Sequence, residues 1–211
     1  MQVLVTGATG RTGRSIVAAL SRAGCKVDCL SRSAGPTVFS ELDNINIIQG
    51  NLESDQDVER AIARNKYIYH IPPNMHPKEI EIGKRVIGIA SQNKVEHLVY
   101  HSVLHPQLQK LPHHWNKLFV EEAVIDSGLP YTILQPSSYM QNLLLDWPNI
   151  VEKGVHTLAF SIQAKLSLVD LEDVAEVAAI IVGSLQHQGS IYELAGPQML
   201  SGEDKAQILS S

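Results

Sequence analysis

The chain begins with an apolar run that leads directly into a glycine-rich turn, and a helical pattern follows the turn at once. The turn, residues 6–13, has the sequence TGATGRTG. Glycines at this spacing have separate tasks: the first permits a tight turn, the second lets the backbone approach phosphates, and the third lets the helix pack closely on the strand. The helix then directs its unpaired N–H groups and its positive dipole end at an anion. The pattern predicts a dinucleotide-binding unit in which the pyrophosphate contacts Gly7, Thr9, Gly10, Arg11, Thr12 and Gly13.

Hydrophobic runs and helical patterns alternate along most of the chain. The runs are rich in Val, Ile, Leu and Tyr, which favour strands. Alternation of strands and helices is typical of a parallel sheet that is covered by helices on both faces. We expect strands at residues 2–6, 26–31, 45–49, 66–71, 96–101 and 130–135, with helices at 12–23, 54–64, 76–92 and 113–127.

The pattern becomes less regular after Pro136. A chain of 211 residues is long enough for one such core and too short for two full domains. We therefore predict an α/β fold: a Rossmann-like, doubly wound parallel sheet over residues 1–135, with a small C-terminal substrate-side subdomain, residues 136–211, packed on the same core. In this second part we expect helices at 138–147 (ended by Pro148), 171–185 and 202–209, and strands at 155–160, 165–169 and 190–194.

Charge and hydropathy narrow the possible partners. The formal net charge is -5 and no basic run is present, so direct binding to nucleic acid is not expected. No apolar stretch is long enough to span a bilayer, and the first residues lack the basic region of a signal peptide. We therefore expect a cytoplasmic protein that is not attached to a membrane.

The residues at the carboxyl ends of the strands indicate the cofactor, because ligands of open α/β sheets lie at that edge. Arg32 follows the second predicted strand, where an acidic residue would bind the ribose of NAD and an arginine suits the 2′-phosphate of NADP. The sequence thus favours NADP(H) over NAD(H), unless Arg32 is an ordinary solvated loop residue. Asn51, beside Leu52, either hydrogen-bonds the adenine or belongs to a simple turn. Ile71 and Pro72 are expected to contact the ribose through backbone and apolar atoms.

Further short motifs follow in order along almost the whole chain. Their order and spacing together resemble the NmrA-like family of the atypical short-chain dehydrogenase/reductase superfamily. The resemblance implies a Rossmann fold that binds NAD(P). The motifs are residues 6–10, Arg32, residues 96–100, Lys117 with Glu121, residues 130–136 followed by Tyr139 and Asn142, and residues 169–170 with 173–175.

The resemblance also implies a catalytic region, and this chain departs from its pattern there. Reductases of the superfamily use a Tyr-x-x-x-Lys pair on a helix, in which the lysine holds the ribose hydroxyls. Here Lys117 is present and His113 occupies the tyrosine position. His113 titrates near neutral pH and either supplies a proton or is an ordinary residue at the start of the helix. Ser102, in the region of the superfamily's catalytic serine, either polarises a carbonyl or caps its loop.

The remaining candidates complete the predicted site. Pro136 is expected to contact the cofactor, and Asn142 the substrate. Tyr139 either lines a pocket above the nicotinamide or is a plain core aromatic. A metal site is not expected, because the nine histidines, notably His97, His101 and His105, lack an accompanying cluster of carboxylates or thiolates.

Two functions are consistent with this site. The first is an NADPH-dependent oxidoreductase of a quinone or a small carbonyl substrate, since hydride transfer from a nicotinamide needs mainly positioning. The second is a non-catalytic sensor that binds NADP(H) and signals redox state to a regulatory protein partner. The missing tyrosine leaves both functions open, and the small C-terminal part modestly favours the sensor. A sugar epimerase is disfavoured because it needs that tyrosine. A homodimer is compatible with either function.

Overall fold

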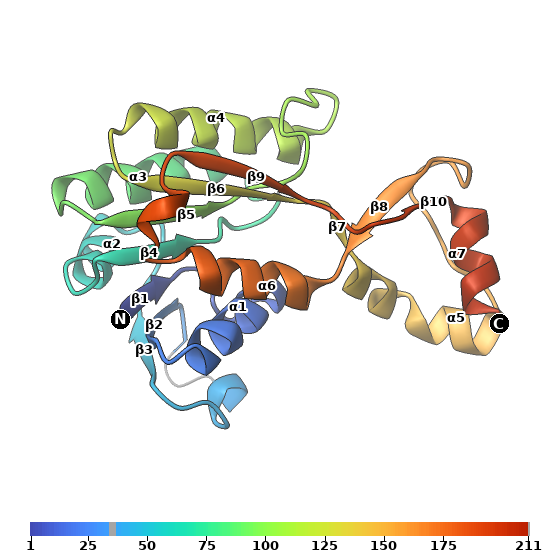
Figure 1. Cartoon of the computed structure of the whole chain (residues 1–211), viewed down its shortest axis with the longest axis horizontal. Helices are drawn as coiled ribbons and strands as arrows, with labels where there is room; N and C mark the ends of the chain where they lie inside the picture. The colour runs from blue at the N-terminus through green and yellow to red at the C-terminus, as the bar shows by residue number, and fades with distance from the viewer. Residues whose placement is uncertain (34–36, 211) are drawn as a thin grey trace.

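The computed structural model describes residues 1–33 and 37–210 and shows a large body with a smaller lobe at one end (Figure 1). The body is built on a parallel sheet. Among the described residues its strands are, in order across the sheet, β3 (Ile45–Gln49), β2 (Lys26–Ser31), β1 (Gln2–Val5), β4 (Tyr67–His70), β5 (His97–His101), β6 (Tyr131–Pro136) and β9 (Ser190–Leu194). The strand order reverses between β1 and β4. In a doubly wound sheet this reversal opens the crevice in which ligands bind.

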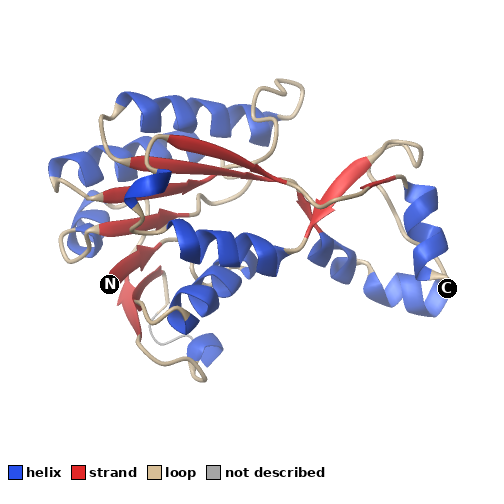
Figure 2. Ribbon diagram, in the orientation of Figure 1, coloured by secondary structure: helices blue, strands red, loops and turns tan. Residues whose placement is uncertain are grey.

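Helices cover both faces of the sheet (Figure 2). One face carries α1 (Arg11–Arg22) and α6 (Leu171–Ile181), and the other carries α2 (Asp55–Ile62), α3 (Glu79–Gln92) and α4 (Pro112–Asp126). Neighbouring strand residues alternate between the two cores, so Val99 is buried on the α1 side and Tyr100 on the α4 side. No helix in the described part of the chain combines the length and the apolar character needed to cross a membrane.

The smaller lobe lies beyond the carboxyl end of β6 (Figure 1). Its sheet contains β10 (Met199–Leu200), β8 (Leu166–Val169) and β7 (Ser138–Tyr139), and its helices are α5 (Trp147–Lys153) and α7 (Gly202–Leu209). Short 3-10 helices are η1 (Thr37–Phe39), η2 (Met140–Leu145) and η3 (Leu185–His187). Between β8 and β10 the chain returns to the body to form α6 and β9. Residues 136–211 thus contribute to both parts, and a domain boundary at 135/136 stays a prediction.

The predicted α/β fold is confirmed, and every strand and helix expected within residues 1–135 is present. The lobe differs from the prediction. Residues 138–147 form β7 and η2 instead of one helix. Pro148 lies in the first turn of α5 rather than ending a helix, a position where the missing N–H of proline costs nothing.

Two further predictions after residue 136 are wrong in part or whole. The apolar run at 155–160 is not a strand, because the Asp146 carboxylate accepts the Thr157 N–H at 2.7 Å in place of a neighbouring strand. The helix expected at 171–185 ends at Ile181. Gly183 follows with φ 77°, and its N–H leaves the helix to donate to the His97 ring at 3.2 Å.

Candidate cofactor and active site

The turn after β1 is shaped by its glycines. Gly7 has φ 63°, a left-handed conformation that suits glycine, and a Cβ there would lie 2.9 Å from the Ile71 carbonyl oxygen. A Cβ on Gly13 would overlap the carbonyl oxygens of Gly7 and Ala8, so glycine is needed for α1 to start this close to β1. No side chain among the described residues caps α1. Its first N–H groups are therefore available to an anion.

The turn opens into a cavity of about 1240 Å³ that follows the carboxyl edge of the main sheet. All residues predicted to bind the cofactor, bind the substrate or take part in catalysis line this one cavity. They are Gly7, Thr9, Gly10, Arg11, Thr12, Gly13, Arg32, Asn51, Leu52, Ile71, Pro72, Ser102, His113, Lys117, Pro136, Tyr139 and Asn142. Strand ends that are far apart in the sequence meet here because parallel strands share one carboxyl edge.

The end of the cavity beside β2 and β3 carries Arg32 and Asn51. Arg32 is exposed, and its side chain makes no hydrogen bond or ion pair with other described residues. The Asn51 side-chain oxygen accepts the Glu53 N–H at 3.1 Å, while the Asn51 N–H donates to Asp57 at 3.0 Å. Asn51 therefore forms a turn, one of its two expected roles, and an adenine contact stays a prediction.

Lys117 lies buried on α4, and its ammonium is paired with a carboxylate that the sequence analysis missed. The Lys117 Nζ forms an ion pair with Glu79, which begins α3 and has no exposed surface. Burial lowers the pKa of Lys117, and the negative charge of Glu79 opposes that shift. The second Glu79 oxygen has no hydrogen-bond partner among the described residues. The two residues are 38 positions apart, so no local pattern indicates the pair.

A second buried carboxylate, Glu121, lies one turn further along α4. It accepts the Ser102 hydroxyl, and each of its oxygens is 3.0 Å from the Gln135 amide nitrogen. Burial raises the pKa of Glu121, while these hydrogen bonds and the charge of Lys117 oppose the rise. Ser102 is therefore bonded to a helix carboxylate, and its action on a substrate carbonyl stays a prediction.

His113 lies one turn before Lys117, and both side chains line the cavity, in agreement with their four-residue spacing. Partial burial lowers the pKa of His113, and the charges of His114 and Lys117 add to the effect. These effects favour the neutral form of His113. Its role in catalysis stays a prediction.

Tyr139 and Asn142 line the cavity from the side of the lobe. The Tyr139 hydroxyl is 2.6 Å from Nε2 of His101, and Nδ1 of His101 is 2.8 Å from the Tyr69 hydroxyl. The Asn142 amide donates to the Ser138 hydroxyl at 3.2 Å. Within residues 1–33 and 37–210 no group of three or more His, Cys, Asp and Glu side chains is arranged to hold a metal ion.

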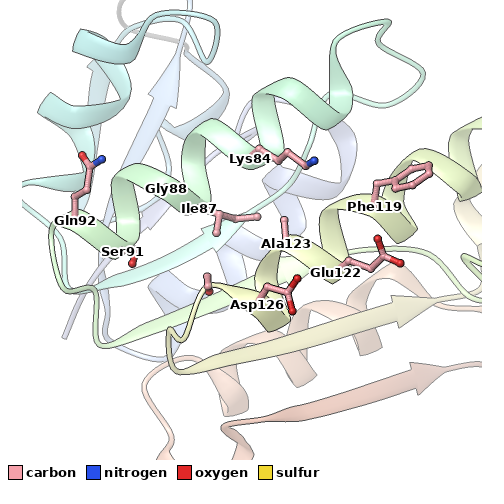
Figure 3. Close-up of a pocket in the computed structure, with 10 residues that line it drawn as sticks. Lys84, Ile87, Gly88, Ser91, Gln92, Phe119, Glu122, Ala123 and Asp126 are labelled. Atoms are coloured by element: carbon pink, nitrogen blue, oxygen red, sulfur yellow. The ribbon is translucent and has the colours of Figure 1, made fainter.

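A smaller pocket of about 580 Å³ lies between α3 and α4 (Figure 3). Its walls include Lys84, Ile87, Phe119 and Asp126. None of the predicted site residues lines it. The residues predicted to form the site therefore line the larger cavity and not this pocket.

The parallel sheet with helices on both faces defines a Rossmann-type fold. The uncapped start of α1 and the large cavity lie at its switch point, where ligands of such folds bind. The chain belongs to the NmrA-like family, whose model matches residues 1–211. The family inferred from the motifs is thus confirmed.

Known proteins resemble the chain over nearly its whole length. It is 28% identical over 214 residues to the NAD(P)H azoreductase of Xenophilus azovorans, covering 99% of this chain and 73% of that protein. It is 24% identical over 218 residues to the photosystem II assembly factor Ycf39 of Cyanophora paradoxa, covering 99% of this chain and 67% of that protein. The structure of the NADPH-dependent quinone oxidoreductase QOR2 of Escherichia coli, complexed with NADPH, matches with a TM-score of 0.87 at 24% identity, covering 99% of this chain and 74% of that one. At this identity the structural match establishes the fold.

Proposed function

We propose that this protein binds NADP(H) and uses NADPH to reduce a quinone or a small carbonyl compound. The observation that carries the proposal is the single cavity that joins the glycine turn and Arg32 to Lys117 and Tyr139. Its volume of about 1240 Å³ is larger than a typical small-molecule pocket and suits a dinucleotide together with a small substrate. Relatives named as an NAD(P)H azoreductase and an NADPH-dependent quinone oxidoreductase support the same chemistry.

Arg32 supports a preference for NADP(H). It follows β2, the position from which an Asp or Glu holds the ribose in NAD-binding proteins. A guanidinium with no partner among the described residues can bind a phosphate through two parallel hydrogen bonds. Arg11 brings a second cation to the start of α1, where positive charge is unfavourable unless an anion is bound.

Lys117 is suited to hold the nicotinamide ribose even though it is paired with Glu79. An ammonium has three N–H donors, and Glu79 accepts one of them. The ion pair fixes the side chain in the cavity wall and leaves two donors for the ribose hydroxyls. The bound nicotinamide supplies the hydride, and the residues of this chain orient the substrate and provide the proton.

Thermal melting tests the cofactor preference, because a ligand that binds only the folded state stabilises it by RT ln(1 + [L]/Kd). We expect NADPH to raise Tm more than NADH does at equal concentration, and Arg32→Ala to remove the difference. Arg64→Ala, which changes an exposed arginine outside the cavity, is the matched control and should keep it. Equal shifts with both cofactors in the unmodified protein would show that Arg32 does not bind a phosphate.

The histidine at position 113 favours a second candidate, a sensor that binds NADP(H) without turnover and reports to a protein partner. The relative named as a photosystem II assembly factor supports this alternative. A quinone assay separates the two functions. Steady oxidation of NADPH that depends on added quinone supports the reductase, whereas a melting shift without oxidation across a quinone panel supports the sensor.

A further inference from the structure

His101, the last residue of β5, lies between two tyrosine hydroxyls. Its Nδ1 is 2.8 Å from the Tyr69 hydroxyl and its Nε2 is 2.6 Å from the Tyr139 hydroxyl. His101 and Tyr69 are buried, whereas Tyr139 is half-buried and lines the cavity. The three side chains therefore connect the interior of the sheet to the site.

The direction of these hydrogen bonds follows from the charge of His101. Burial and the nearby positive charge of Lys117 lower the pKa of His101 to about 3, so the ring is neutral at pH 7 and has one N–H and one acceptor nitrogen. If Nδ1 carried the hydrogen, Tyr69 would accept it, and the Tyr69 hydrogen would have no acceptor among the described residues. A buried donor without an acceptor is costly. Tyr69 therefore donates to Nδ1, and the ring hydrogen is on Nε2.

This tautomer determines where the Tyr139 hydrogen points. The Nε2–H of His101 donates to the Tyr139 oxygen. Burial raises the pKa of Tyr139 to about 12, while the nearby Thr12 hydroxyl and the positive charge of Arg11 oppose the rise. A tyrosine oxygen that accepts the His101 N–H still carries its own hydrogen. Because Tyr139 lines the cavity, this hydrogen is available to a molecule bound there.

We propose that Tyr139 is the proton donor to the substrate oxygen and thus does the task of the tyrosine that His113 replaces; this proposal rests on the proposed reductase function. The hydride from NADPH gives the substrate two electrons. The O–H bond of Tyr139 breaks as a new O–H bond forms on the substrate oxygen. The negative charge stays on the Tyr139 oxygen, stabilised by the N–H of His101 and the nearby charge of Arg11, until water returns a proton after the product leaves. His101 stays neutral throughout and acts as a positioning residue.

The tautomer of His101 tests the proposal without any turnover. In protein labelled with 15N in the histidine rings, long-range 1H–15N spectra distinguish the two tautomers and the charged ring. We expect a neutral ring protonated on Nε2 at pH 7, with the signal assigned by its absence in His101→Gln. A neutral ring protonated on Nδ1 would overturn the proposal, because Nε2 would then accept the Tyr139 hydrogen. A charged ring would overturn it too, because His101 would then itself carry a proton to give.

Single-turnover oxidation of NADPH by a quinone tests the donor itself. Tyr139→Phe should slow this step by about 10²-fold or more, the usual effect of losing a positioned proton donor. Tyr192→Phe is the matched control: it removes another hydroxyl bonded to a histidine, 2.9 Å from His187, outside the cavity, and should not change the rate. An unchanged rate in Tyr139→Phe would overturn proton donation while leaving the reductase intact. If the unmodified protein does not oxidise NADPH with any quinone, the reductase function itself fails, and proton donation fails with it.

Two further measurements separate proton donation from other roles. Tyr139→Phe should keep the melting shift with NADPH; loss of the shift would assign Tyr139 to cofactor binding instead. His101→Gln retains an amide N–H near the position of Nε2 and should keep most of the rate, whereas His101→Leu should lose it. Equal losses in the Gln and Leu variants would show that the imidazole only fills space.

Discussion

Two consecutive residues, His101 and Ser102, lead into two different networks, one on each side of the main sheet. On the α1 side, His101 joins Tyr69 and Tyr139 through bonds between neutral groups. On the α4 side, Ser102 bonds Glu121, which lies near the charge of Lys117. Strand alternation causes the separation, because neighbouring side chains of a strand point to opposite faces. The neutral network fixes the position of a hydrogen, whereas the charged one fixes a cation at the cavity wall.

The charged network depends on pairing to a degree that the neutral one does not. Glu79 has no exposed surface, and Lys117 is the partner of its single bonded oxygen. A buried ion without its counter-ion is far less stable than a buried pair or an apolar replacement of the pair. Lys117 is therefore expected to matter for folding as well as for cofactor binding.

Lys117→Met gives the largest effect that we predict. Removing the ammonium leaves the Glu79 carboxylate buried and unpaired, and breaking such a pair typically costs about 3–5 kcal/mol. The measurement is the free energy of unfolding in urea. The double variant Glu79→Leu with Lys117→Met removes both charges and should recover most of the loss. Equal stability of Lys117→Met and the unmodified protein would contradict the buried pair. It would also mean that the charged network depends on pairing no more than the neutral network does.

The pH dependence of stability tests the neutral network. Burial lowers the pKa of His101 and of His70 to about 3, and that of His97 to about 4. In the unfolded chain these rings titrate near pH 6.5. Between the folded and unfolded pKa values the unfolded state binds more protons, so their contribution is fully present above pH 6.5 and is lost as the pH falls toward 4. Each group removes about 1.4 kcal/mol per pH unit in that window.

Urea unfolding at pH 6.5, 5.5 and 4.5, repeated on His101→Gln, isolates one of these groups. As the pH falls, the free energy of unfolding should decrease less steeply in the variant than in the unmodified protein. The difference in slope should equal the contribution of one histidine. Parallel slopes would mean that His101 is protonated in the folded protein, which would also remove the distinction between the two networks.

The sequence predicted the body, and it selected residues that line one cavity, because both depend on local patterns. Alternating apolar runs identified the strands, and the turn at residues 6–13 located the cofactor end. Arg32 follows β2, Lys117 lies on α4 after β5, and Tyr139 lies on β7 after β6. They line one cavity because the segments that follow parallel strands start from one edge of the sheet.

The hydrogen-bond and ion-pair partners of the site residues could not be predicted from sequence patterns. Glu79 lies 38 positions from Lys117, and Tyr69 lies 32 positions from His101, so each pairing is set by the packing of separate elements. The lobe was predicted less well for a different reason. A short apolar run such as 155–160 is compatible with strand, helix or loop, and the Asp146 carboxylate decides the outcome.

The oxidation of NADPH by a simple quinone under anaerobic conditions, with catalytic amounts of protein, tests the central claim most directly. The absence of oxygen prevents the reduced product from being reoxidised and fixes the stoichiometry. The account predicts saturable consumption of NADPH, with one quinone reduced for each NADPH oxidised over many turnovers. NADPH that raises Tm but is not consumed with any quinone of the panel would contradict it and leave a cofactor-binding sensor.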